Sequence, residues 1–137
     1  MQKLFPNIHK ALTGIISLGV FAQMFFAGLW HAEVFETPEV HVFFGLTLLL
    51  CSLIALIAAL AGRMGRSIIA PTATLFILIL LQPILIEQRR AGIPFISAFH
   101  TLNAGIIGMT SGIIASRSSA PQPDTAESVL FSSAVGD

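Results

Sequence analysis

Five side chains with an amide or imidazole group interrupt the apolar stretches of this 137-residue chain, and two of them belong to a residue type that ligates metals. The five are Gln23, His41, Gln82, His100 and Asn103. A polar side chain in a membrane helix is costly, so by default it points into the helix bundle and marks a packing contact or a function. Neutral imidazole is a common ligand of metals and of haem iron. Metal ligation is therefore the first chemistry to consider.

The glutamines and histidines recur at a fixed spacing. Gln23 precedes His41 by 18 residues, Gln82 precedes His100 by 18 residues, and the two pairs are offset by 59 residues. A fixed offset between similar segments indicates an internal repeat. We therefore expect two tandem helical hairpins of the same topology. The same offset also pairs Ala11 with Ala70, Thr13 with Thr72, Gly45 with Ala104 and Ser52 with Ser111.

The elements that would position these residues are four apolar stretches. Hydrophobic residues make up 55% of the chain, charged residues only 10%, and the mean hydropathy is +0.87. This composition lacks the polar surface of a soluble domain, and a helix crosses the hydrocarbon core with about 20 apolar residues. We predict an all-α transmembrane four-helix bundle within residues 1–117, and a disordered cytoplasmic tail at 118–137, rich in Ser, Ala and Pro. The expected spans are 11–30, 40–62, 67–86 and 94–116.

The basic residues predict the orientation of the bundle. The chain has seven Lys and Arg residues. An up-down-up-down arrangement puts five of them on one side of the membrane, and an excess of Lys and Arg marks the cytoplasmic side. We expect both termini in the cytoplasm, in the inner membrane of a bacterium, with His9 on a solvated flank beside Lys10. The apolar spans make lipid an expected partner. The net charge is zero and no basic run exists, so nucleic acid is not expected as a partner. The five are Lys3, Lys10, Arg63, Arg66 and Arg117, and the other two are Arg89 and Arg90.

In such a bundle the second and fourth helices lie diagonally across the core, so His41 and His100 should face each other. Interaxial distances of about 8–10 Å give a diagonal of roughly 11–14 Å, which two inward imidazoles and an iron atom between them would span. We therefore predict haem b with His41 and His100 as its ligands. The two histidines lie at different distances from the starts of their helices, so the structure must compensate for this difference. His41 follows Pro38 by three residues and His100 follows Pro94 by six, a difference of about 4.5 Å in helix rise.

Other residues have candidate roles in this haem site. Gln23 and Gln82 would orient the imidazoles, as outer partners of metal ligands commonly do. Small residues at Gly45 and Ala104 would make room for the macrocycle, although close helix packing explains them equally well. Arg89 and Arg90 are candidates for holding the propionates, because the guanidinium fork binds carboxylate in bidentate fashion, or they are simple interface anchors. These candidate residues are Gln23, Gln82, Gly45, Ala104, Arg89 and Arg90.

The histidine segments resemble those of a known family. His41 begins the segment His-Val-Phe-Phe-Gly, and His100 lies in Phe-His-Thr-Leu-Asn-Ala. The pattern resembles half of haem A synthase, a family built from two four-helix bundles, each with a histidine on its second and fourth helices near the outer face. It also resembles a small, uncharacterised family of four-helix bacterial membrane proteins with Gln-then-His hairpins. The resemblance covers residues 8–116 and implies haem ligation by His41 and His100, with Glu39 as the nearby carboxylate.

These residues leave several functions open. The leading hypothesis is a b-type haem protein that transfers electrons or handles haem near the outer face, with a redox partner; the sequence favours a carrier or subunit but leaves open whether it is an enzyme. The alternative is an accessory subunit of a larger respiratory or photosynthetic membrane complex, in which the histidines bind a cofactor or only make hydrogen bonds between helices. A zinc site is disfavoured because it needs about four ligands. A proton-coupled transporter is disfavoured because no carboxylate lies within the spans.

Overall fold

The computed structural model describes residues 4–119, except for the side chains of Arg89 and Ser119, and all of its regular elements are helices. Four of these helices are long and apolar enough to cross a membrane, as in a multi-pass membrane protein. Part of the segment expected to be a tail is helical, because the last helix runs through Ser119, and the rest of that segment lies outside the described residues. The helices are α1 Leu4–His31, α2 Glu39–Ala61, α3 Arg66–Arg90, α4 Pro94–Ser97 and α5 Phe99–Ser119.

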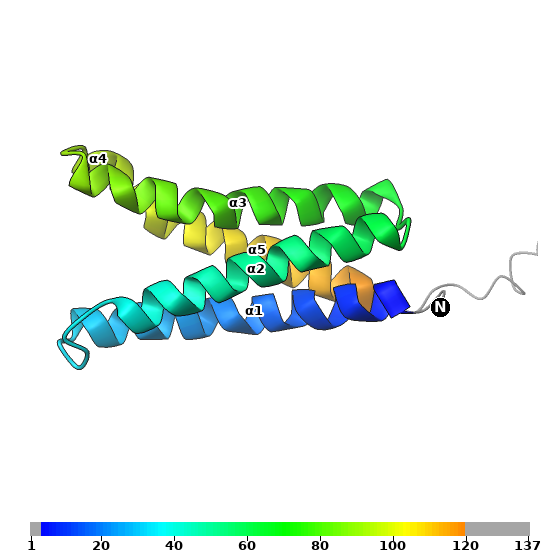
Figure 1. The fold of residues 1–137 in the computed structure, drawn as a ribbon, viewed down its shortest axis with the longest axis horizontal. Helices are drawn as coiled ribbons and strands as arrows, with labels where there is room; N and C mark the ends of the chain where they lie inside the picture. The colour runs from blue at the N-terminus through cyan, green and yellow to red at the C-terminus, as the bar shows by residue number, and fades with distance from the viewer. Residues whose placement is uncertain (1–3, 120–137) are drawn as a thin grey trace, which may run out of the picture.

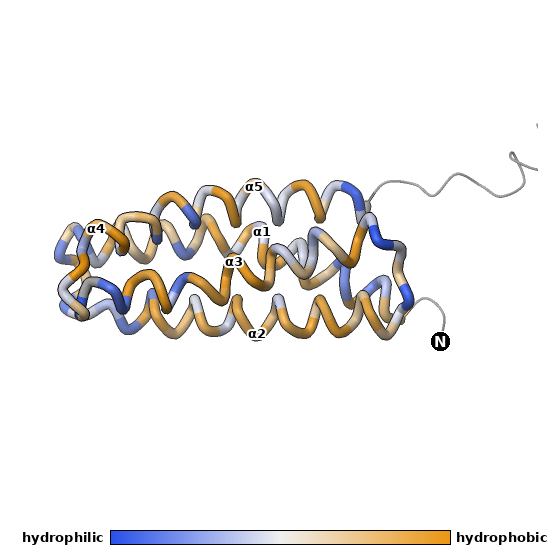
Figure 2. The backbone as a smooth tube through the Cα atoms, turned by 90° about the horizontal axis from the view of Figure 1, so that it is seen from above, coloured by the Kyte–Doolittle hydropathy of each residue, from blue (hydrophilic) through white to orange (hydrophobic). Residues whose placement is uncertain are grey.

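The four long helices form one bundle in which successive helices run back and forth along its length (Figure 1). The helices α1 and α2, α2 and α3, α3 and α5, and α5 and α1 pack side by side, whereas among the described residues no Cα atoms of α1 and α3, or of α2 and α5, lie within 8 Å of each other. The helices α2 and α5 therefore lie diagonally across the bundle. Hydrophobic residues cover the middle of the long helices, and hydrophilic ones gather mainly near the two ends (Figure 2).

One end of the bundle, here named the histidine end, contains the loop at 32–38 and the short helix α4. Gly92 has a φ of +81°, a left-handed conformation that suits glycine, and it lets the chain turn after α3. Pro94 then starts α4, where a proline at the first helical positions costs no hydrogen bond. A turn at Ala98 separates α4 from α5. The fourth span is therefore broken near its start rather than continuous from residue 94.

The core of the bundle repeats with the same offset of 59 residues that the sequence contains. Six of the buried side chains of α1 and α2 have buried counterparts 59 residues later on α3 and α5. The two buried threonines of one such pair bond to the preceding turn of their own helix in the same way: Thr13 donates to His9 O and Thr72 donates to Ile68 O. The buried pairs are Thr13 with Thr72, Ile16 with Leu75, Val20 with Ile79, Leu48 with Ile107, Ser52 with Ser111, and Ala55 with Ile114.

The prediction of a solvated flank at His9 is wrong. The helix α1 begins at Leu4, so His9 lies inside it and is fully buried. Its Nε2 lies 2.9 Å from Thr72 Oγ1 on α3, and its Nδ1 lies 3.5 Å from Ser118 Oγ on α5. His9 therefore joins three helices at the other end of the bundle, here named the amino-terminal end, where α1 begins.

Candidate functional site

The structure brings the two paired histidines together at the histidine end. His41 is the third residue of α2, and His100 is the second residue of α5. The centres of their rings are 6.2 Å apart, and the ring planes are inclined by 58°. The short α4 and the turn at Ala98 take up the three extra residues that precede His100, which removes the mismatch in helix rise expected from the sequence.

Both histidines are anchored by the same hydrogen bond. His41 Nδ1 lies 3.1 Å from Gln23 O, and His100 Nδ1 lies 3.2 Å from Gln82 O. A carbonyl oxygen only accepts, so each Nδ1 carries the proton and donates it. Each neutral ring then has its lone pair at Nε2. Ligand histidines in metal sites commonly have this arrangement, because the bond at one nitrogen fixes the ring and leaves the other nitrogen for the metal.

The distance between the rings suits one metal ion placed between them. A metal–nitrogen bond of about 2.0 Å on each side, plus about 1.15 Å from each nitrogen to its ring centre, separates the ring centres by about 6.3 Å when the two nitrogens lie in line. The observed 6.2 Å agrees with this value. Rotation about the metal–nitrogen bonds leaves the angle between the ring planes free. The ring spacing is therefore compatible with ligation of one ion from both sides, provided that the two Nε2 atoms turn toward each other and His41 Nε2 leaves its bond to Gln23.

The two glutamines place their side chains differently. Gln23 Nε2 donates to His41 O at 2.8 Å and lies 3.3 Å from His41 Nε2, which accepts because Nδ1 holds the proton. Gln82 Oε1 instead accepts a bond of 3.2 Å from Asn103 Nδ2, which also donates to Leu78 O at 2.7 Å. The side chain of Gln23 therefore contacts an imidazole nitrogen, whereas the side chain of Gln82 bonds to Asn103.

Asn103 has a role that the sequence did not reveal. It is only 7% exposed, and both of its bonds go to α3, so it fixes the amide of Gln82. The sequence marks Asn103 as a polar residue within a span, but position 44, its counterpart in the first hairpin, is a phenylalanine. The repeat therefore gave no sign of this contact.

The space beside Gly45 is filled by Gln23. A Cβ atom added at Gly45 would come within 2.7 Å of Gln23 Nε2, so this glycine admits the glutamine amide in the structure. The expectation that Gly45 makes room for a macrocycle therefore requires Gln23 to move. Its side-chain Oε1 is buried and has no hydrogen-bond partner among the described residues. An unsatisfied buried oxygen is unfavourable, so a shift that gives Oε1 a partner would offset part of the loss of the two bonds that Gln23 Nε2 makes to His41.

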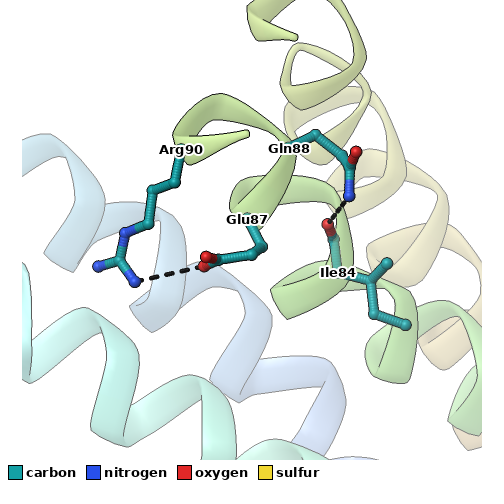
Figure 3. Close-up of polar contacts among 4 residues, drawn as sticks. All are labelled: Ile84, Glu87, Gln88 and Arg90. Carbon is teal, nitrogen blue, oxygen red and sulfur yellow. Dashed lines mark hydrogen bonds and ion pairs between the residues drawn. The ribbon is translucent and has the colours of Figure 1, made fainter. Parts of the chain in front are cut away.

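The predicted arginines lie at the end of α3, and one of them has a local partner. Arg90 Nη1 lies 3.3 Å from Glu87 Oε2, and the Arg90 side chain is 82% exposed. The pair lies on one side of the helix end, while Gln88 bonds to Ile84 O on another side (Figure 3). The side chain of Arg89 is outside the described part. Arg90 is thus a surface residue that would have to leave Glu87 to bind a ligand.

A metal site made only of protein ligands is not found in the described region. No group of three or more His, Cys, Asp or Glu residues is close enough there to hold an ion. His31, a third histidine at the histidine end, packs against Trp30 with ring centres 5.1 Å apart. Two histidines suffice when the cofactor itself supplies the other donors, as the four nitrogens of haem do.

Comparison with known proteins gives one family. Residues 23–89 match a family of unknown function (DUF6220). This segment runs from Gln23 on α1 to the end of α3, so it includes Gln23, His41 and Gln82 but stops before His100. No curated protein and no solved structure matches the chain.

Proposed function

We propose that this chain is a small integral membrane protein that binds haem b between His41 and His100, for electron transfer or haem handling near the outer face of the membrane. The observation that carries the proposal is the pair of anchored imidazoles with ring centres 6.2 Å apart. In this proposal the bundle lies in a bacterial inner membrane in up-down-up-down topology, with the amino-terminal end in the cytoplasm. The haem iron would supply one-electron redox chemistry.

The residues around the pair would bind and orient rather than catalyse. The carbonyl oxygens of Gln23 and Gln82 hold each ring in the tautomer that a metal ligand needs. Asn103 keeps the amide of Gln82 on α3. Electron transfer requires no acid, base or nucleophile from the protein, which agrees with a site made of imidazoles and amides.

Absorption spectra of the full chain in detergent, loaded with haem b, test this proposal. Wild-type protein should give a Soret band and, when reduced, sharp α and β bands. His41→Ala and His100→Ala should each abolish the low-spin spectrum, and the double variant should be little worse, because either loss breaks the same site. His31→Ala is the matched control, since His31 is an exposed histidine at the same end. Unaltered spectra in both variants would remove the haem hypothesis.

A second candidate is an accessory subunit of a larger membrane complex, in which the histidines only join helices. One observation favours it: both ring nitrogens of His41 already have partners on α1. Under this reading the two alanine substitutions should cost modest amounts of stability, about 0.6 kcal/mol each for interhelical bonds in membranes, and the losses should add. The same variants, measured by unfolding rather than by absorption, therefore separate the two candidates.

A further inference from the structure

The two hairpins hold their histidines alike at Nδ1 but differ at Nε2. In the first hairpin the amide of Gln23 donates to His41 Nε2 at 3.3 Å. In the second hairpin Gln82 is bonded to Asn103, and His100 Nε2 has no hydrogen-bond partner among the side chains that the structure describes. The lone pair of His100 is thus available, whereas that of His41 is already engaged.

Two neighbouring positions explain this difference. Gly45 leaves room for the amide of Gln23, because a Cβ atom there would come within 2.7 Å of Gln23 Nε2. The corresponding position in the second hairpin is Ala104, whose methyl group would obstruct the same conformation of Gln82. Contacts below 3.0 Å require one of the atoms to shift, so a methyl group at position 45 would displace the amide of Gln23.

The preceding position acts in the same direction. Asn103 draws the Oε1 atom of Gln82 toward itself, and it is held in place by its bond to Leu78 O. Its counterpart Phe44 has no hydrogen-bonding group and packs edge-on against Phe26, with ring centres 5.2 Å apart. Gln23 therefore has no such competitor on α2.

We propose that the two histidines of the haem site are unequal: His100 is the permanent ligand, and His41 is the ligand that a small neutral molecule can displace, because Gln23 competes for its Nε2. This inference rests on the proposed haem site and concerns how firmly each histidine would hold the haem. To bind haem iron, His41 would have to give up its hydrogen bond from Gln23. His100 would not, because no amide among the described side chains bonds to its Nε2.

Carbon monoxide is the probe for a displaceable ligand, because it binds reduced haem iron only where a coordination position opens. The affinity of the full, haem-loaded protein for carbon monoxide should be measured for Gly45→Ala and for Gly112→Ala. The added methyl group at position 45 displaces Gln23 and leaves His41 free to bind iron. Loss of one neutral hydrogen bond as competitor should lower the affinity for carbon monoxide about two- to tenfold. A Cβ atom added at Gly112 would meet no neighbouring side chain within 4 Å among the described residues, so Gly112→Ala is the matched control and should bind carbon monoxide as the wild type does.

Nitrogen NMR of the histidine side chains in haem-free protein gives an independent readout. In wild type the Nε2 resonances of His41 and His100 should differ, and Gly45→Ala should move that of His41 toward that of His100. Equal affinities for carbon monoxide in the two glycine variants, or a wild type that binds none, would overturn this inference while leaving the haem site intact. A wild-type protein that takes up no haem would overturn the proposed function and this inference together.

Discussion

Replacing Thr72 by valine tests the buried contact between α1 and α3 at the amino-terminal end. His9 Nε2 lies 2.9 Å from Thr72 Oγ1. The Thr72 hydroxyl already donates its only hydrogen to Ile68 O at 2.8 Å, so its oxygen accepts a hydrogen bond from the N–H at His9 Nε2. Valine has nearly the same shape as threonine but cannot accept a hydrogen bond. The substitution would therefore leave an imidazole N–H unpaired.

The expected loss follows from the burial of His9. An unpaired buried donor costs about 1–3 kcal/mol in soluble proteins, whereas interhelical bonds in membranes average about 0.6 kcal/mol. His9 is fully buried, so neither water nor a lipid headgroup can reach the abandoned N–H. We expect Thr72→Val to lower the free energy of unfolding by about 1–2 kcal/mol.

Thr74→Val is the matched control. Thr74 lies on the same helix and bonds to Ala70 O at 3.1 Å, but its side chain is exposed and has no partner on another helix among the described residues. Its replacement should change stability by less than about 0.5 kcal/mol. Equilibrium unfolding in mixed micelles, followed by helical circular dichroism, measures both. In a His9→Leu background, where the bond to Thr72 is absent, Thr72→Val and Thr74→Val should change the free energy of unfolding by similar amounts. Equal effects of Thr72→Val and Thr74→Val in the wild-type background would refute the reasoning.

Two further predictions concern the core and the orientation. Leu75→Ala should lower the free energy of unfolding by about 2–5 kcal/mol, because Leu75 is fully buried, whereas Leu81→Ala on the lipid-facing surface should cost less than about 1 kcal/mol; unfolding in micelles measures both. In a Cys51→Ala background, a cysteine at Glu36 should be labelled by an impermeant reagent added outside the cell, and one at Arg63 should not. The reverse labelling would contradict a cytoplasmic amino-terminal end.

The four helices could be predicted because the bilayer demands a simple property, about 20 consecutive apolar residues. The same rule failed at helix ends, where charged and polar residues continue a helix beyond its apolar part. His9 shows why. The apolar stretch begins at Ala11, but α1 begins at Leu4, and the two additional turns carry His9 into the contact between helices. The matched residues Thr13 and Thr72 were visible in the sequence, but nothing there linked Thr72 to His9.

The site could be predicted in part for a similar reason. Gln and His at equal spacing mark positions where a polar group lies within a span, and the structure brings His41 and His100 to one place. The orientations of the glutamine amides could not be predicted. They depend on clearances of a few tenths of an ångström, such as that between Gly45 and Gln23 Nε2, and on the bond between Asn103 and Gln82.

Comparison of the two hairpins distinguishes positions that serve packing in both from positions at which the hairpins differ. Where the two hairpins agree, as at the buried pairs Ile16 with Leu75 and Ser52 with Ser111, one set of packing contacts serves both halves of the bundle. Packing alone does not require the hairpins to differ at neighbouring positions facing the two histidines. They do differ there, with Phe44 and Gly45 in one hairpin and Asn103 and Ala104 in the other. Gly45 admits the amide of Gln23 beside His41, and Asn103 holds the amide of Gln82 on α3, so these positions give the two hairpins different glutamine orientations.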